Sequence, residues 1–391
     1  MRALTWEGKH SVEMKNVRDP KILKPDDVII KITTAAICGS DLHLYNGYIP
    51  TMKKGDILGH ENMGEIVEIG PNVKNLKVGD KIVVAFDMGC GKCWHCDHEE
   101  YSACDNSNPN AHMAETLYGS SGAGLYGYSH LYGGYAGGQA EYLRVPWAEV
   151  NSIVVPKGIE DEKVLFLSDI FPTGWMAAEN ANIKRGDTVA VWGCGPVGQL
   201  AIRSAFMLGA ERVIAIDHYE SRLNLAAAAG AETINFDKTE EGILDEIKYL
   251  TGGVGPDSCI DAVGLEAHGH TITATIDRAK AAVMLATDRP DVLRQAMQSC
   301  RKAGTVSIPG VYGGLLDKIP FGAAFGKGLK FAMGQTHTQK YMKPLLDKIL
   351  EGEIDPSEII SHRIDISEGP EAYKNFNDNK EEYRKVVIKM H

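Results

Sequence analysis

The chain has 391 residues, of which 44% are hydrophobic and 24% charged, and this length exceeds what one ordinary core supports, so we expect two domains. Its net charge of -11 argues against nucleic acid as a partner, because phosphate binding needs clustered Lys and Arg. No apolar run approaches the ~20 residues that cross a bilayer, and residues 1–7 lack the apolar core of a signal peptide, so we expect a cytoplasmic protein without disulfides.

Two patterns of secondary structure follow one another along the chain. Short apolar, partly β-branched runs at 28–34 and 82–86 predict a β-rich part from about residue 28 to 150. From about residue 160 the predicted elements alternate, with strands at 188–192, 212–216 and 258–262 and helices at 198–208 and 221–229. This alternation is typical of an α/β domain whose parallel sheet carries helices on both faces. A further helix is predicted at 341–350.

A stretch rich in Gly, Tyr and Ser runs from Tyr118 to Gly138. It is too long to be an ordinary connection between elements. We therefore interpret it as a functional or assembly loop.

Four of the eight cysteines fall within 15 residues, at positions Cys90, Cys93, Cys96 and Cys104. Zinc binds four thiolates tetrahedrally at ~2.3 Å, and a small loop containing glycine can wrap it. Four unrelated thiols would seldom gather so closely, and a reducing compartment disfavours disulfides. Because four protein ligands leave no open position, the spacing predicts a structural zinc.

A second metal site is suggested by Cys38 and by His60, about twenty residues later. A catalytic zinc needs three protein ligands and one open position. Each of these two residues alone has an ordinary structural explanation, and the third ligand cannot be found from spacing. Asp169 and Glu61 are the carboxylate candidates, although Asp169 would also suit the N-cap of the next helix.

The run from Val189 to Gly198 places Gly193, Gly195 and Gly198 after a predicted strand and before a predicted helix, with Pro196 and Val197 between them. Such a loop brings backbone close to a pyrophosphate, which the helix N-terminus then faces. Asp217 ends the next predicted strand, roughly 20 residues after the glycine loop. A carboxylate at this sequence separation binds the adenosine ribose and repels a 2′-phosphate. The pattern therefore favours NAD over NADP. Arg222 is a further candidate for the ribose.

Together, these motifs make the chain similar to the zinc-dependent medium-chain alcohol dehydrogenases, whose motif order it follows over essentially its whole length. Within that family it most resembles the glutathione-independent formaldehyde dehydrogenase branch, at residues 126–130, 133–135, 137–142, 169–174 and 261–269. The resemblance implies a GroES-like β-rich catalytic domain with the structural-zinc lobe at 1–170. It also implies a doubly wound Rossmann coenzyme domain at 171–335 and a segment at 336–391 that returns to the first domain.

The same resemblance implies metal ligands and their supports. Cys38 and His60 match the first two ligands of a catalytic zinc, and Asp169, at a position where this branch has an aspartate, becomes the preferred third ligand. Glu61 matches an acid that can approach the metal. Asp41 matches a carboxylate that orients the ligand histidine. A proton relay from the zinc-bound oxygen to solvent is matched by Ser40 and His43.

Other matching positions lie beside substrate or cofactor. Phe86 matches a position in the substrate pocket, and Thr173 and Val311 match positions beside the nicotinamide. Lys385 aligns with a basic residue that can approach the pyrophosphate, although a surface lysine is an equally good interpretation. Residues 313–330 form a shorter stretch than in the formaldehyde dehydrogenases, where extra segments help to enclose the cofactor.

We therefore expect an oxidoreductase that binds two zinc ions per chain, one catalytic and one structural, and oxidises small aldehydes and alcohols with NAD. The alternatives are a polyol or threonine dehydrogenase of the same family, a zinc-free quinone reductase on the same scaffold, and a non-catalytic NAD-binding redox sensor. A homo-oligomer is expected, with a tetramer favoured over a dimer. The predicted edge strand near 305–311 and the stretch from Tyr118 to Gly138 are the candidate contact surfaces.

Overall fold

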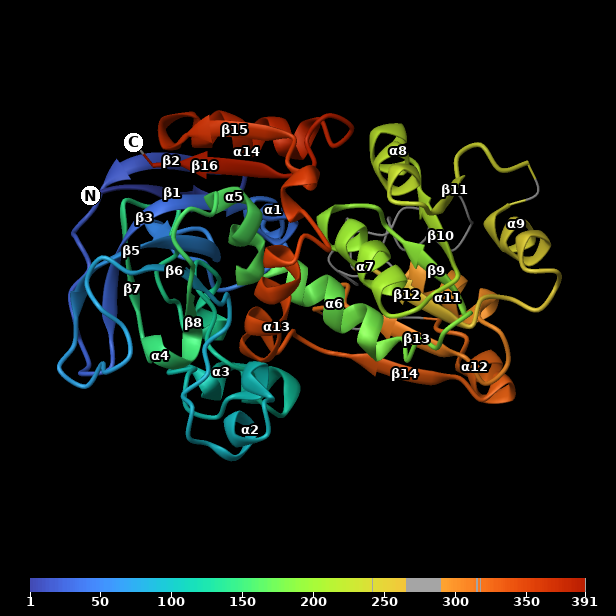
Figure 1. The fold of residues 1–391 in the computed structure, drawn as a ribbon, viewed down its shortest axis with the longest axis horizontal. Helices are drawn as coiled ribbons and strands as arrows, with labels where there is room; N and C mark the ends of the chain where they lie inside the picture. Colours follow the sequence, from blue (N-terminus) through green and yellow to red (C-terminus); the bar gives the residue numbers. More distant parts are fainter. Residues whose placement is uncertain (241, 265–289, 314–315, 317, 391) are drawn as a thin grey trace. The chain divides into compact units, whose positions relative to one another are not determined.

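Figure 1 shows a computed structural model of the chain, which describes residues 1–240, 242–264, 290–313, 316 and 318–390. The chain divides into two compact units. Unit 1 comprises Met1–Pro172 and Thr336–His391, and unit 2 comprises Thr173–Gln335. Among the described residues, no helix combines the length and the apolar character that crossing a membrane requires.

Unit 1 is built on a sheet in which the strands follow the order β15-β16-β3-β5-β6-β8, with β7 also paired to β3. Its pairings are antiparallel except that between β15 and β16. The bounds are β3 (Val28–Ile37), β5 (Glu61–Ile69), β6 (Lys81–Val84), β7 (Tyr142–Val145), β8 (Ser152–Val154), β15 (His362–Asp365) and β16 (Val386–Lys389). A second sheet has the order β2-β1-β4, with β1 (Arg2–Gly8), β2 (Ser11–Asn16) and β4 (Asp56–Ile57).

Short helices connect these strands. The α-helices are α1 (Gly39–Tyr45), α2 (Trp94–Asp97), α3 (Ala111–Tyr118), α4 (Ala148–Asn151), α5 (Asp161–Val164), α13 (Thr338–Leu350) and α14 (Gly369–Asp378). The 3-10 turns are η1 (Tyr101–Ala103), η2 (His130–Tyr132), η3 (Leu165–Ser168), η4 (Pro356–Ile359) and η5 (Ile366–Glu368). The stretch from Tyr118 to Gly138 is thus mostly irregular, as predicted, with η2 and isolated bridges at Leu125 and Tyr126. Helix α6 (Ile170–Asn180) begins in unit 1 and ends in unit 2.

Unit 2 contains a parallel sheet with the strand order β11-β10-β9-β12-β13-β14. The strands are β9 (Thr188–Trp192), β10 (Arg212–Asp217), β11 (Glu232–Asn235), β12 (Ser258–Asp261), β13 (Thr305–Ile308) and β14 (Lys330–Met333). Counted from β9, this is the order of the doubly wound nucleotide-binding fold, in which the strand order reverses between the adjacent first and fourth strands. The predicted Rossmann architecture is confirmed.

Helices pack on both faces of the sheet of unit 2, and each face has its own hydrophobic core. Alternate residues of β9 face opposite sides, so Trp192 packs in one core with residues of α9 (Ile243–Leu250) and α11 (Asp291–Ser299). Val191 packs in the other core with α6, α7 (Pro196–Met207) and α8 (Glu220–Ala228). Since successive strand residues point to opposite faces, the near-continuous apolar runs in the sequence reflect burial on both sides. The last helix of this unit is α12 (Phe321–Lys327).

One expectation about this sheet is wrong. Residues 305–311 were expected to form its edge, but β13 pairs with β12 on one side and β14 on the other. Within the described residues, β14 is the edge strand beyond β13. The sequence of β14 gave little sign of this, because only four residues of moderate hydrophobicity form the strand.

Candidate functional site

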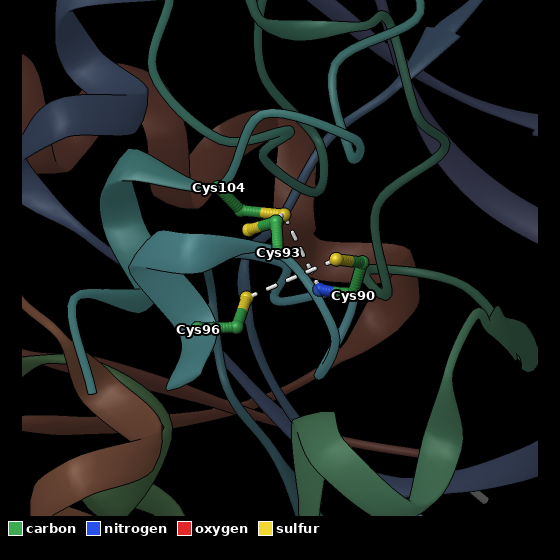
Figure 2. A group of neighbouring side chains, drawn as sticks. All are labelled: Cys90, Cys93, Cys96 and Cys104. Atoms are coloured by element: carbon green, nitrogen blue, oxygen red, sulfur yellow. Dashed lines mark hydrogen bonds between the residues drawn. The ribbon is translucent and has the colours of Figure 1, made fainter. Parts of the chain in front are cut away.

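The four clustered cysteines converge in a lobe of unit 1. Figure 2 shows their sulfur atoms turned toward one another, with Cys90 Sγ 4.0 Å from Cys96 Sγ. Cys93 Sγ lies 3.9 Å from Cys104 Sγ, and all four donor atoms lie within 4.8 Å of one another. Four sulfurs at ~2.3 Å from a tetrahedral zinc would stand about 3.8 Å apart. The donor set and its spacing therefore fit a structural zinc.

The surroundings of the lobe shift the pKa values of its thiols in opposite directions. Burial opposes ionisation of Cys90, but the Asn106 amide, 3.3 Å from its sulfur, and a backbone hydrogen bond lower its pKa to about 7. Burial instead raises the pKa of Cys104. Four buried sulfurs cannot all ionise without a cation among them. Zinc supplies that charge, which agrees with the fit of the distances.

A second group of donor atoms forms elsewhere in unit 1, from Cys38, His60, Glu61 and Asp169. Cys38 follows β3 at the N-cap of α1, and Glu61 opens the neighbouring strand β5 opposite Ala36. Asp169 comes from the turn after η3 and lies 3.7 Å from Cys38 Sγ and 3.3 Å from His60 Nε2. The sheet and one distant turn thus bring together all the residues predicted as candidate ligands.

The charges of this group fit a cation. Burial alone would lower the pKa of His60, but the charge of Asp41 and the hydrogen bond to Asp169 raise it well above its usual value. The ring therefore lies in a strongly negative field. Glu61 Oε2 is buried and has no hydrogen-bond partner in the described part of the chain. A divalent ion bound by a thiolate, an imidazole and a carboxylate would satisfy this field, as a catalytic zinc site does.

Asp41 supports the ligand histidine, and its own position is fixed from two sides. Asp41 Oδ1 lies 3.1 Å from His60 Nδ1, so the ring presents Nε2 to the other donors. Asp41 Oδ2 accepts hydrogen bonds from Cys38 N at 2.9 Å and from Gln139 Nε2 at 3.2 Å. Gln139 Oε1 in turn accepts from the Tyr373 hydroxyl at 2.8 Å. Sequence reasoning gave Gln139 and Tyr373 no role, although Gln139 belongs to a motif of the resemblance.

The two predicted relay residues share helix α1. Ser40 Oγ lies 3.2 Å from His60 Nε2, so it stands next to the metal-ligand group. His43, three residues later, is buried and its ring lies 6.4 Å from that of Tyr48. Residues three apart lie on the same side of a helix. Ser40 and His43 therefore lie on the same side of α1, and their role as a relay stays a prediction.

Lys385 is buried, which contradicts the interpretation of it as a surface lysine. Its side chain is 0% exposed, and its Nζ pairs with Glu61 Oε1. It also lies 5.5 Å from the centre of the Phe166 ring. Burial lowers the pKa of Lys385, but the charges of Glu61 and Cys38 outweigh it and raise the pKa above its usual value. Lys385 is therefore not a surface lysine but lies with the metal-ligand group, and its role toward the pyrophosphate stays a prediction.

Aromatic rings line the histidine of this group. The Phe86 ring centroid lies 6.2 Å from that of His60 in an edge arrangement, so Phe86 neighbours the metal-ligand group. Tyr128 lies 6.5 Å from His60, also edge-on, and Tyr132 lies 5.8 Å from Tyr128. Burial raises the pKa of Tyr132 to about 12. Both tyrosines therefore stay neutral near neutral pH.

In unit 2, the glycine loop joins β9 to α7. Helix α7 begins at Pro196, two residues earlier than predicted, since proline suits the first turn, and Val197 follows it. Gly193 has φ +86°, and a Cβ at Gly198 would lie 1.7 Å from Gly193 O, so the turn admits no side chain there. A Cβ at Gly195 would meet only Arg222 Nη1, at 3.8 Å. This open backbone at a helix N-terminus is what pyrophosphate binding needs.

Asp217 ends β10 beside this loop. Its Oδ2 accepts from Cys194 N at 2.7 Å, and its Oδ1 accepts from His218 N at 2.7 Å and Tyr219 N at 3.1 Å. The carboxylate thus holds the glycine loop in addition to the ribose role expected of it. The Arg222 guanidinium stacks on the Tyr219 ring at 4.5 Å from its centre.

The remaining predicted cofactor residues also lie in unit 2. Thr173 is its first residue, within α6. Val311 follows β13, and its backbone packs closely on Gly264 after β12. Both strand ends belong to the carboxyl edge of the sheet, where such folds bind ligands. Of the motif at 261–269, residues 265–269 lie outside the described residues.

Comparisons with known proteins agree on one family. Residues 24–156 match the alcohol dehydrogenase GroES-like domain, and residues 196–287 match the zinc-binding dehydrogenase family. The chain is 39% identical to an uncharacterized zinc-type alcohol dehydrogenase-like protein of Bacillus subtilis (strain 168), over 100% of both chains. It is 34% identical to a glutathione-independent formaldehyde dehydrogenase of the same organism, over 100% of this chain and 97% of that one. The solved structure of alcohol dehydrogenase TADH from Thermus sp. ATN1 matches with a TM-score of 0.83 and 32% identity, over 100% of both chains.

Proposed function

This chain belongs to the zinc-dependent alcohol dehydrogenase family, and we propose that it oxidises small aldehydes and alcohols, formaldehyde in particular, by hydride transfer to NAD. The observation that carries this proposal is the donor group of Cys38, His60 and Asp169, which contains one thiolate. We assign Asp169 as the third ligand because its Oδ2 lies 3.7 Å from Cys38 Sγ and 3.3 Å from His60 Nε2, whereas Glu61 shares one carboxylate oxygen with Lys385. When bound, zinc supplies Lewis acidity toward the substrate oxygen, and one thiolate rather than two leaves that acidity stronger, which suits hydrated aldehydes as well as alcohols.

The residues of α1 handle the proton. Ser40 Oγ, 3.2 Å from His60 Nε2, takes the proton of the substrate hydroxyl, and His43 passes it toward solvent. Asp41 keeps the His60 ring oriented while this happens. Phe86 presents an apolar edge beside the same ring, which excludes water from the reacting carbon.

NAD is favoured over NADP by the charge at the end of β10. Asp217 and the glycine loop are joined by the hydrogen bond from Cys194 N, so the carboxylate stays where an adenosine ribose would lie. A carboxylate there accepts from a ribose 2′-hydroxyl and repels a 2′-phosphate. Relatives of the formaldehyde dehydrogenase branch, 34% identical over the whole chain, support the choice of substrate.

A steady-state assay of the zinc-loaded protein tests this function. Formaldehyde, C2–C6 alcohols, sorbitol and threonine are compared with NAD, with NADP and with no added cofactor. We expect turnover of the short aldehydes and alcohols with NAD. Turnover without added NAD that yields both acid and alcohol would show retained cofactor and dismutation. Activity on sorbitol or threonine alone would contradict the substrate class, and no turnover with two zinc ions bound would favour a redox sensor.

The Asp169→Ala variant tests the ligand assignment separately. We expect it to bind one zinc per chain and to lose turnover, whereas Glu61→Gln keeps both zinc ions. Retention of two zinc ions and full activity in Asp169→Ala would overturn the assignment.

We also propose a homo-oligomeric, cytoplasmic enzyme, with a tetramer as the favoured state. An unpaired strand edge such as that of β14 readily pairs with another chain. Apolar side chains stand exposed in and near this edge, at Phe321, Phe325 and Met333, and Phe325 is 90% exposed. Sedimentation at micromolar concentration tests the assembly, and a monomer would contradict it.

A further inference from the structure

The stretch from Tyr118 to Gly138 contributes a tyrosine to the metal-ligand group that the chemistry proposed above does not use. The Tyr128 ring lies edge-on to His60, with a centroid distance of 6.5 Å and an angle of 86° between the planes. The Tyr132 ring lies 5.8 Å from that of Tyr128. Tyr128 therefore neighbours both the ligand histidine and a second aromatic ring.

Close backbone contact fixes Tyr128 beside His60. Gly127 has φ +53°, and a Cβ there would come within 2.5 Å of Gly59 N. Gly59 and Gly127 each directly precede one of the two rings. The backbones at Gly59 and Gly127 come so close that only glycine fits at residue 127. This contact sets Tyr128 and His60 next to each other.

The turn that follows Tyr128 is also held in place. Leu131 N, in η2, donates to Thr51 Oγ1 at 3.0 Å. Leu131 O accepts from Asn108 Nδ2 at 2.9 Å. Because the N–H and the carbonyl of Leu131 both bond to other segments, η2 is fixed in place. The ring of Tyr132, which also belongs to η2, is thereby held near Tyr128. The aromatic pair is thus organised before any substrate binds.

The hydroxyl of Tyr128 has no assigned partner. The residue is 8% exposed, yet its phenol makes no hydrogen bond to any residue that the structure describes. Unlike the Tyr126 hydroxyl, that of Tyr128 is not fully enclosed by protein atoms. A phenol that stays accessible beside a metal-ligand group suits a ligand that brings a hydrogen-bond partner.

We propose that the Tyr128 hydroxyl binds the second oxygen of a hydrated aldehyde, and so makes this site selective for gem-diols over alcohols. The inference rests on the proposed function and deepens it. A gem-diol carries two hydroxyls on its reacting carbon, and only one of them can occupy the open metal position. The other would lie near the rings of Phe86 and Tyr128, of which only Tyr128 carries a hydroxyl that can hydrogen-bond it. A primary alcohol has hydrogen at that position and gains nothing from the phenol.

The chemistry remains that of the dehydrogenase. The carbon of the hydrated aldehyde loses its hydride to NAD, one hydroxyl proton leaves to solvent, and the products are carboxylic acid and NADH. Tyr128 exchanges no proton in this step. Burial raises the pKa of Tyr128 above its usual value, so the phenol keeps its proton and can donate to the second oxygen throughout.

Tyr128→Phe removes this hydroxyl and keeps the ring. With the zinc-loaded enzyme and NAD, we expect kcat/KM for formaldehyde to fall roughly tenfold, which corresponds to about 1.4 kcal/mol. The value for 1-butanol should stay within twofold of wild type. Tyr126→Phe is the matched control, since it removes another buried hydroxyl from the same stretch, but one whose ring packs in a different core. It should leave both values unchanged.

Binding of formate, whose two oxygens share one carbon, provides a readout independent of turnover. Calorimetry should give a dissociation constant about tenfold weaker in Tyr128→Phe at unchanged zinc content. Equal losses on formaldehyde and 1-butanol would indicate a structural role and overturn the inference, as would undiminished formaldehyde turnover and formate binding. Absence of aldehyde turnover in the wild-type enzyme would instead contradict the proposed function itself, and this inference with it.

Discussion

Replacing Lys385 by Met tests the buried ion pair beside the metal ligands. The side chains of Lys385 and Glu61 are both 0% exposed, and the pair lies among other acids of the ligand group. Methionine keeps most of the length and volume of lysine, so the packing against Phe166 is largely retained while the charge is lost. Removing one partner of a buried pair leaves the other charge uncompensated and costs about 3–5 kcal/mol.

The assay is urea unfolding of the zinc-loaded protein, with zinc content measured in parallel. We expect Lys385→Met to be destabilised by that amount. The double variant Lys385→Met/Glu61→Gln should recover about 1–3 kcal/mol of it, because residues in direct contact couple by such amounts. The reasoning is refuted if Lys385→Met unfolds within about 1 kcal/mol of wild type, or if the double variant is no more stable than the single one.

Three further predictions concern other parts of the molecule. Cys93→Ser should lower the zinc content from two ions to one per chain and reduce the thermal midpoint by several degrees, since a structural zinc contributes folding energy; unchanged zinc content would contradict it. Gly198→Ala sets a methyl group 1.7 Å from Gly193 O and should weaken NAD binding at least tenfold, whereas Gly326→Ala, whose Cβ meets nothing within 4 Å, should not. Burial raises the pKa of Asp87 to about 7, so the folded state binds this proton more tightly than the unfolded state, whose pKa is about 3.9. The free energy of unfolding should therefore fall by about 1.4 kcal/mol per pH unit between pH 4 and 7. Urea unfolding of wild type and Asp87→Asn at pH 5 and 8 measures this, and the variant should lack the decrease. An equal decrease in both proteins would refute the assignment.

Much of the fold and part of the site could be predicted because their signals are local. The strand at 188–192 matches β9, since a run buried on both faces is apolar throughout. The four-cysteine spacing needs only a short loop to bring its sulfurs together. The glycine loop is equally local, because a tight turn admits only residues without a Cβ.

The supports of the catalytic group could not be found in this way. Gln139 bonds Asp41 from 98 residues away, and Tyr373 bonds Gln139 from a further 234. Only tertiary folding makes these residues neighbours, and one glutamine or tyrosine has no distinguishing local pattern. The burial of Lys385 could not be predicted for the same reason, because a lysine is exposed far more often than buried.

Strand register explains why Lys385 reaches the metal ligands at all. Central strand β3 ends at Ile37, directly before Cys38, and pairs with β5 so that Ala36 lies opposite Glu61. On its other side, β16 pairs with β3 so that Val386 lies opposite Ile37, which brings the preceding Lys385 level with Cys38. A slip of one residue in β16 would turn every side chain of that strand to the other face and leave Glu61 buried without a cation. The C-terminal segment therefore completes the charge balance of the metal site, and its pairing with β3 is a condition for the chemistry proposed there.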